Sequence, residues 1–107
     1  MNKERFLKML GLAVRAGGVA FGEGAAQDSI RKKSAYLVII SQDGSDNTKK
    51  KFRNSCDFYS VKYTEYGTRN ELGKATGREF AVGVAVTTKN IADNLIEMLN
   101  EEKGETF

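Results

Sequence analysis

The segment Tyr36-Leu37-Val38-Ile39-Ile40 constrains the fold more than any other, because it is an uninterrupted apolar run near the middle of the chain. A strand with one solvated face alternates apolar and polar residues, whereas a strand covered on both faces reads as a continuous apolar run. The segment therefore predicts a buried strand. A buried strand requires a sheet with other elements packed against both of its faces.

Helix and strand signals alternate along the rest of the chain. Phe6, Leu7, Leu10, Ala13 and Val14 recur at helical spacing, and Gly17-Gly18 ends that pattern. The full prediction has helices over residues 3–16, 22–33, from 45 onward, 68–77 and from 88 onward, and strands over residues 19–21, 36–40, 59–63 and 80–86. This alternation predicts an α/β protein, a three-layer α/β/α sandwich in which five helices cover a small mixed four-stranded sheet. We expect one domain over residues 1–100 and a frayed tail over residues 101–107.

Two predicted helices begin with capping signals. Ser45 can cap the third helix. Residues 68–71, Thr-Arg-Asn-Glu, form a capping box, in which the hydroxyl and the carboxylate each bind an otherwise unpaired amide. Asp43 and Asp46 flank Ser45, and we interpret them as turn and cap residues rather than as a metal-binding or acid–base pair.

Composition narrows the chemistry that the chain can perform. It has 107 residues, no histidine and a single cysteine. Without histidine the usual proton shuttle is missing, and one thiol forms neither an internal disulfide nor a zinc site. Cys56 lies four residues after Phe52, so both are predicted to face the core. No segment, including the N-terminal MNKERFLKMLGLAV, resembles a signal peptide or a membrane span. We therefore expect a cytoplasmic protein without catalysis, metal, cofactor or small-molecule substrate, monomeric by default.

Charge is distributed unevenly. Residues 1–90 hold sixteen Lys and Arg against nine Asp and Glu, whereas residues 91–107 hold one Lys against five acids. A cationic body with an acidic last helix suits a polyanionic partner, although a soluble charged surface gives the same pattern. Lys49, Lys50, Lys51 and Arg53 fan around their helix rather than form one stripe, which is typical of solvated side chains.

The stretch from Gly17 to Gly24 contains four glycines in eight residues and invites comparison with nucleotide-binding loops. A P-loop needs Lys and Ser or Thr after its second glycine, but Glu23 and Gly24 stand there. The dinucleotide fingerprint needs a third glycine where Gln27 stands. What remains is a strand, a small-residue turn and a helix start with exposed amides and a favourable dipole, followed by Arg31, Lys32 and Lys33. Such a corner suits a phosphodiester backbone, and a tight structural turn is the alternative.

Several motifs together resemble one family. LGLAVRAGG, FGEGAAQDSIRKK, AYLVIISQDGSDNTKKK, ELGKATGRE and VGVAVT occur in the order seen in the ribosomal protein L7Ae superfamily, and most closely resemble its small bacterial YlxQ-like branch. The resemblance covers the chain from about Phe6 to Leu99. Residues 41–48 and 72–78 are its most specific parts.

This resemblance implies an α/β/α sandwich that binds kink-turns, which are sharply bent RNA elements with sheared G·A pairs and a bulge. It places the strand-to-helix corner at the kink and the loop at 43–45 beside a flipped base. The implied RNA-binding residues are Gly22, Glu23, Gly24, Ala25, Asp28, Arg31, Lys32, Ser45, Arg69, Arg78, Val82 and Gly83. The implied partner is structured RNA, such as ribosomal RNA, in a ribosome- or translation-associated role.

The chain departs from the family pattern at three of these positions. RNA-binding members usually carry Asn-Glu where this chain has Gly24-Ala25, and a lysine where it has Asp28. The departures predict kink-turn-like binding with weak or altered sequence demands, in which backbone amides and RNA shape matter more. A protein-interaction adaptor that keeps the fold and has lost specific RNA binding is the alternative hypothesis.

Overall fold

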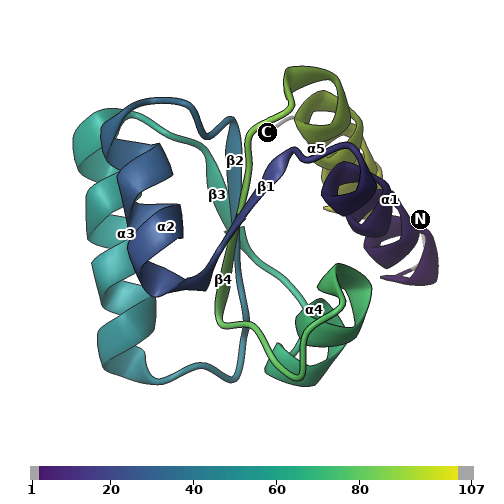
Figure 1. Cartoon of the computed structure of the whole chain (residues 1–107), viewed down its shortest axis with the longest axis horizontal. Coiled ribbons are helices and arrows are strands. Elements are labelled where there is room, and N and C mark those ends of the chain that lie inside the picture. The colour runs from purple at the N-terminus through teal and green to yellow at the C-terminus, as the bar shows by residue number, and fades with distance from the viewer. Residues whose placement is uncertain (1–2, 104–107) are drawn as a thin grey trace.

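A computed structural model describes residues 3–103 of the chain and shows helices on both faces of one sheet (Figure 1). The sheet has four strands in the order β1-β4-β2-β3. Along the chain, the elements are α1 (Lys3–Arg15), β1 (Val19–Phe21), α2 (Gly22–Arg31), β2 (Leu37–Ile40), α3 (Asp46–Tyr59), β3 (Tyr63–Glu65), α4 (Arg69–Thr76), β4 (Gly83–Val86) and α5 (Lys89–Lys103). The predicted three-layer α/β/α sandwich with a mixed sheet is confirmed.

Strand directions place two helix starts at the same edge of the sheet. β1 and β2 both pair antiparallel with β4, so they run parallel to each other, and β3 pairs parallel with β2. The two parallel connections, through α2 and α3, lie on one face (Figure 1). Because each helix returns the chain against the strand direction, α2 and α3 also run parallel. Their N-termini therefore lie together, at the carboxyl ends of β1 and β2.

Each face of the sheet has its own apolar core. On one face α2 and α3 bury a cluster that includes Ala26, Ile30, Phe52 and Cys56. On the other face α1, α4 and α5 pack around Phe6, Leu10, Leu72, Leu95 and Leu99. All four residues of β2 are buried, as its unbroken apolar sequence predicts. The predicted core positions of Phe52 and Cys56 are confirmed, and burial raises the pKa of the Cys56 thiol to about 12.

Two predicted strands were wrong in their bounds. Residues 59–63 were predicted as a strand, but α3 continues to Tyr59 and β3 begins at Tyr63. Ser60 adopts the left-handed conformation and is the residue at which α3 ends. The strand predicted over residues 80–86 begins only at Gly83, so Phe80, Ala81 and Val82 form a loop. At the C-terminus α5 continues to Lys103, so residues 101–103 of the expected tail are helical, and residues 104–107 lie outside the described residues.

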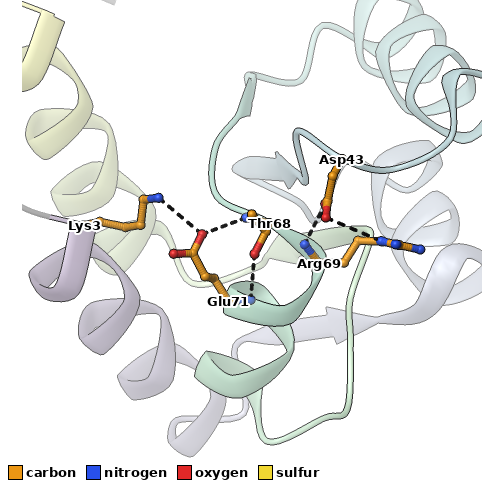
Figure 2. A network of polar contacts seen from close by, with 5 residues as sticks. All are labelled: Lys3, Asp43, Thr68, Arg69 and Glu71. Carbon is orange, nitrogen blue, oxygen red and sulfur yellow. Dashed lines mark hydrogen bonds and ion pairs between the residues drawn. The ribbon is translucent and has the colours of Figure 1, made fainter.

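The predicted capping box at the start of α4 is confirmed (Figure 2). The Glu71 amide donates to Thr68 Oγ1 at 3.1 Å, and the Thr68 amide donates to Glu71 Oε1 at 2.9 Å. Lys3 Nζ on α1 lies 3.3 Å from the same carboxylate. The Thr68 amide, aided by Lys3, holds the pKa of Glu71 below its usual range. The box therefore fixes the start of α4 and links it to α1.

Replacing Thr68 by alanine is expected to lower the free energy of unfolding by about 1 kcal/mol, because one amide of the first turn of α4 loses its partner. Urea denaturation followed by circular dichroism measures the change. The Thr68→Ser variant keeps the hydroxyl and serves as the control. Equal losses in both variants would show that the methyl group matters and the cap does not.

Within residues 3–103 no group of three or more Cys, Asp or Glu side chains is close enough to hold a metal ion. Over the same range, no helix is long and apolar enough to span a membrane.

Candidate nucleic-acid interface

The corner between β1 and α2 exposes the first turn of a helix without a side-chain cap. Phe21 occupies the capping position in extended conformation, and its side chain cannot bind an amide. Residues 22–25 are exposed, and the first buried residue of α2 is Ala26. The first turn of a helix carries amides without intrahelical partners and a partial positive charge. This turn therefore presents donors to solvent, where an anion can approach.

The two glycines of this turn have different roles. Gly22 has φ of +80°, a conformation that residues with a side chain rarely adopt. The backbone therefore needs glycine there to turn from strand into helix. Gly24 has no positive φ, and a Cβ added to it would meet no atom within 4 Å. Glycine at position 24 is thus not required by the fold, and its effect is to leave the backbone bare.

A groove of about 270 Å³ lies beside this turn. Three segments distant in sequence form it: the start of α2, the first half of α3 and the loop between α4 and β4. Its lining residues are Gly22, Glu23, Thr48, Phe52, Arg78, Phe80, Ala81, Val82 and Gly83. The groove thus opens at the sheet edge where α2 and α3 begin, the edge at which ligands commonly bind α/β sheets.

The α4–β4 loop gives the groove its cation and its exposed aromatic ring. The Arg78 guanidinium lies over the Phe21 ring, with Cζ 4.0 Å from the centroid, which holds the charge at the groove. Phe80 is 58% exposed, although it lines the same groove. Because a planar guanidinium and an open ring both stack on nucleobases, the loop has the chemistry to bind an unpaired base.

Close packing holds this loop in place. A Cβ at Gly73 on α4 would lie 2.6 Å from Phe80 Cα, so α4 and the loop backbone are in direct contact. The Arg78 amide donates to the Gly73 carbonyl at 2.7 Å, and the Ala81 amide donates to the Arg69 carbonyl at 3.0 Å. At the groove floor, a Cβ at Gly83 would lie 2.4 Å from the Phe52 ring. Glycine at 83 is therefore required by packing.

The loop after β2 is tied to α4 (Figure 2). The Arg69 amide donates to Asp43 Oδ1 at 2.8 Å, and Arg69 Nε lies 3.7 Å from Oδ2 of the same carboxylate. Ser45 caps α3, and its Oγ accepts from the Thr48 amide at 3.2 Å. Asp43 and Ser45 therefore act as turn and cap residues, as expected. Arg69 and Ser45 are exposed near the groove but do not line it.

Ion pairs engage most of the cations around the site. Arg31 pairs with Asp28 on the exposed side of α2. Lys51 Nζ lies 3.8 Å from Glu23 Oε1, and Lys49 and Arg53 both bind Glu65. Lys32 caps the opposite end of the ten-residue α2, about 15 Å along the axis from Gly22. Of the cations predicted to bind RNA, Arg78 is therefore the one that lines the groove.

The structure brings together part of the set predicted from sequence. Gly22, Glu23, Arg78, Val82 and Gly83 line the groove, Gly24 and Ala25 lie exposed on the turn beside it, and Asp28, Arg31 and Lys32 follow along α2. Among the lining residues, sequence reasoning did not single out Thr48, Phe52, Phe80 or Ala81. Phe80 was missed because it was assigned to a strand. The nearby Gly77 and Arg78 were the signal that favours a loop there.

A larger cavity of about 660 Å³ lies between α1 and α4 on the other face of the sheet. Leu7, Leu12 and Ala75 give it an apolar lining, with Arg15 and Lys74 among its polar residues. None of the residues predicted to bind RNA lines it. The candidate interface is therefore the smaller groove, where the exposed amides are.

Comparison with known proteins relates the chain to ribosomal and RNA-binding proteins. It is 39% identical over 100 residues to the RNA-binding protein YlxQ of Bacillus subtilis, a match that covers 94% of this chain and all of that protein. It is 31% identical over 98 residues to the large ribosomal subunit protein eL30 of Eremothecium gossypii, covering 87% of this chain and 89% of that one.

A solved structure, of a protein of unknown function from Bacillus halodurans, matches with a TM-score of 0.85 and 30% identity, covering 89% of this chain and 96% of that one. The sequence model described as the ribosomal protein L7Ae/L30e/S12e/Gadd45 family matches residues 4–96. That match includes the corner, the groove and the loop that closes it. With this coverage, the chain belongs to the ribosomal protein L7Ae/L30e/S12e/Gadd45 family.

Proposed function

We propose that this protein binds structured RNA at the groove beside the start of α2, as a non-catalytic cytoplasmic protein associated with ribosomes or translation. The exposed, uncapped first turn of α2, facing Arg78 and Phe80, is the observation that carries the proposal. Family membership and the names of the two relatives support it. These names do not favour the interaction-adaptor alternative.

The groove and the corner bind different parts of the RNA. Amides of residues 22–25 and the helix dipole attract a phosphate at the turn. Arg78 and Phe80 stack on a base that has left the helix, which a bulge in the RNA supplies. Glu23 and Asp28 oppose phosphate binding, so the protein reads RNA shape through its backbone more than sequence through its side chains. A kink-turn offers both a sharp bend and an extruded base, and it is the proposed class of ligand.

The proposed contact residues follow from this division. Gly22, Glu23, Gly24 and Ala25 contact the backbone at the bend. Arg78 and Phe80 contact the extruded base, with Val82 beside them in the groove lining. Gly83 acts through the floor that it forms with Phe52. Ser45 and Arg69 are exposed near the groove, whereas Asp28, Arg31 and Lys32 follow along α2 toward its far end.

A gel-shift titration tests the proposal directly. The protein is titrated against a generic kink-turn stem and against an unkinked duplex of the same length, at moderate salt. We expect tighter binding to the kinked RNA. Equal affinity for the two would exclude kink-turn recognition, and no binding to either would exclude the RNA-binding proposal.

Replacing Arg78 by alanine is expected to weaken kink-turn binding by roughly tenfold or more, because it removes a stacking partner of the base, and stacking is worth about 1–3 kcal/mol. The slope of log affinity against log salt should also fall, because one cation beside the RNA is lost. Fluorescence anisotropy at several salt concentrations measures both. Arg15→Ala is the matched control, since Arg15 is an exposed arginine on α1 at the other cavity. A comparable loss in the control would show a general charge effect.

A further inference from the structure

The outer face of α3 carries one stripe of exposed side chains. Asn47, Lys51, Asn54 and Phe58 follow each other at spacings of three and four residues, so they lie on the same side of the helix. All four are exposed. The buried side of the same helix is formed by Phe52 and Cys56. The stripe is therefore not needed for the core.

Phe58 is the most unusual member of this stripe. It is 79% exposed, the highest value among the exposed large hydrophobic side chains of the described residues. The Tyr59 ring meets it edge to face, with centroids 4.8 Å apart and an interplanar angle of 78°. This contact restrains the Phe58 ring while leaving most of its surface in solvent. A restrained, open aromatic ring is a platform on which a base can stack.

The stripe is continuous with the candidate interface. Lys51 Nζ lies 3.8 Å from Glu23 Oε1, and Glu23 lines the groove. Thr48, one turn before Phe52, lines it as well. From Lys51 the helix rises about 10 Å to Phe58. A strand that leaves the groove can therefore follow α3 outward and reach the ring.

The chemistry of the stripe fits a nucleotide strand better than a protein partner. A protein-docking surface usually presents a contiguous apolar patch, whereas here one aromatic ring stands among Asn and Lys side chains. Burial raises the pKa of Tyr63, and the neighbouring Asp57, which hydrogen-bonds to it, raises that pKa further. This contact places Asp57 on the β3 side of the helix. The stripe itself contains no carboxylate to repel phosphate.

We propose that the α3 stripe binds an unpaired strand that continues from RNA held at the groove, with Phe58 stacking on one of its bases. This inference rests on the proposed function of the groove. It extends the interface to single-stranded sequence beside the bend. It also assigns a role to an exposed aromatic residue that neither the core nor the groove uses.

The test compares three RNAs that share one kink-turn stem: a blunt stem, and stems with a short unpaired extension at the 5′ or the 3′ end. We expect wild-type protein to bind one extended RNA more tightly than the blunt one. Phe58→Ala should lose that advantage, by roughly fivefold or more, and bind the blunt stem normally. Phe58→Tyr keeps a stacking ring and should retain the advantage. Anisotropy measures the affinities.

A second measurement reports stacking directly. With 2-aminopurine placed in the extension, wild-type protein should change its fluorescence, and Phe58→Ala should not. Equal wild-type affinity for blunt and extended stems, or an unchanged advantage in Phe58→Ala, would overturn the inference while leaving the groove proposal intact. Unaltered RNA binding in Phe58→Ala would then favour a protein contact at this ring. If wild-type protein binds none of the RNAs, both proposals fail.

Discussion

Replacing Phe52 by alanine is expected to lower the free energy of unfolding by about 3–5 kcal/mol, the range for truncating a buried phenylalanine. Phe52 on α3 is fully buried in the core that α2 and α3 form with the sheet, and a Cβ at position 83 would overlap its ring. Truncation leaves a cavity that the backbone at Gly83 fills only partly. Urea denaturation, read as the midpoint and slope, measures the loss.

RNA affinity should fall in the same variant even where it remains folded. Phe52 forms part of the groove lining, with Val82 and Gly83 beside it. Without the ring, the groove floor at Gly83 loses its support, and the binding surface beside Val82 changes. Kink-turn titration at a temperature well below the midpoint separates this effect from unfolding.

The control for Phe52 lies on the same helix. Phe58→Ala removes the same atoms from a ring that is 79% exposed. Its free energy of unfolding should stay within about 0.5 kcal/mol of wild type, as is usual at exposed sites. Equal destabilisation of the two variants would contradict the assignment of Phe52 to the buried face of α3 and of Phe58 to its exposed face.

Restoring the side chains that RNA-binding family members usually carry is expected to tighten kink-turn binding by roughly tenfold or more. The variant combines Gly24→Asn, Ala25→Glu and Asp28→Lys, and each gained charge-assisted contact is worth about 1.5–3 kcal/mol. The fold has room for them, because a Cβ at Gly24 meets nothing within 4 Å and positions 25 and 28 are exposed. The exposed Asp28–Arg31 ion pair that is lost contributes little to stability.

Affinity for an unkinked duplex distinguishes specific contacts from charge. The triple variant raises net charge by one, so a general electrostatic effect would tighten binding to both RNAs. Specific contacts should tighten only the kinked RNA. Asp93→Asn raises net charge equally on α5, where Asp93 pairs with Lys89, and it serves as the charge-matched control. An equal gain in that control would contradict side-chain recognition at α2.

Local sequence was sufficient to predict which helices and strands occur, but it predicted their boundaries less well. The apolar run at 36–40 specified a strand covered on both sides, and Ser45 and the box at 68–71 specified two helix starts. Residues 59–63 were misassigned because alternation of apolar and polar residues there fits a helix end followed by a loop equally well. Phe80 was misassigned because phenylalanine itself and the nearby Val82 are residues that are enriched in strands.

Sequence alone determined the layered fold, the bare strand-to-helix turn and the family, because each follows from residue patterns that can be read along the chain. Tertiary structure decided the site. It brought Arg78 and Phe80 to the turn at Gly22, and it paired Lys51 with Glu23 and Arg69 with Asp43. Charge balance and exposure depend on partners far along the chain, and only the packing of the sheet and helices selects those partners.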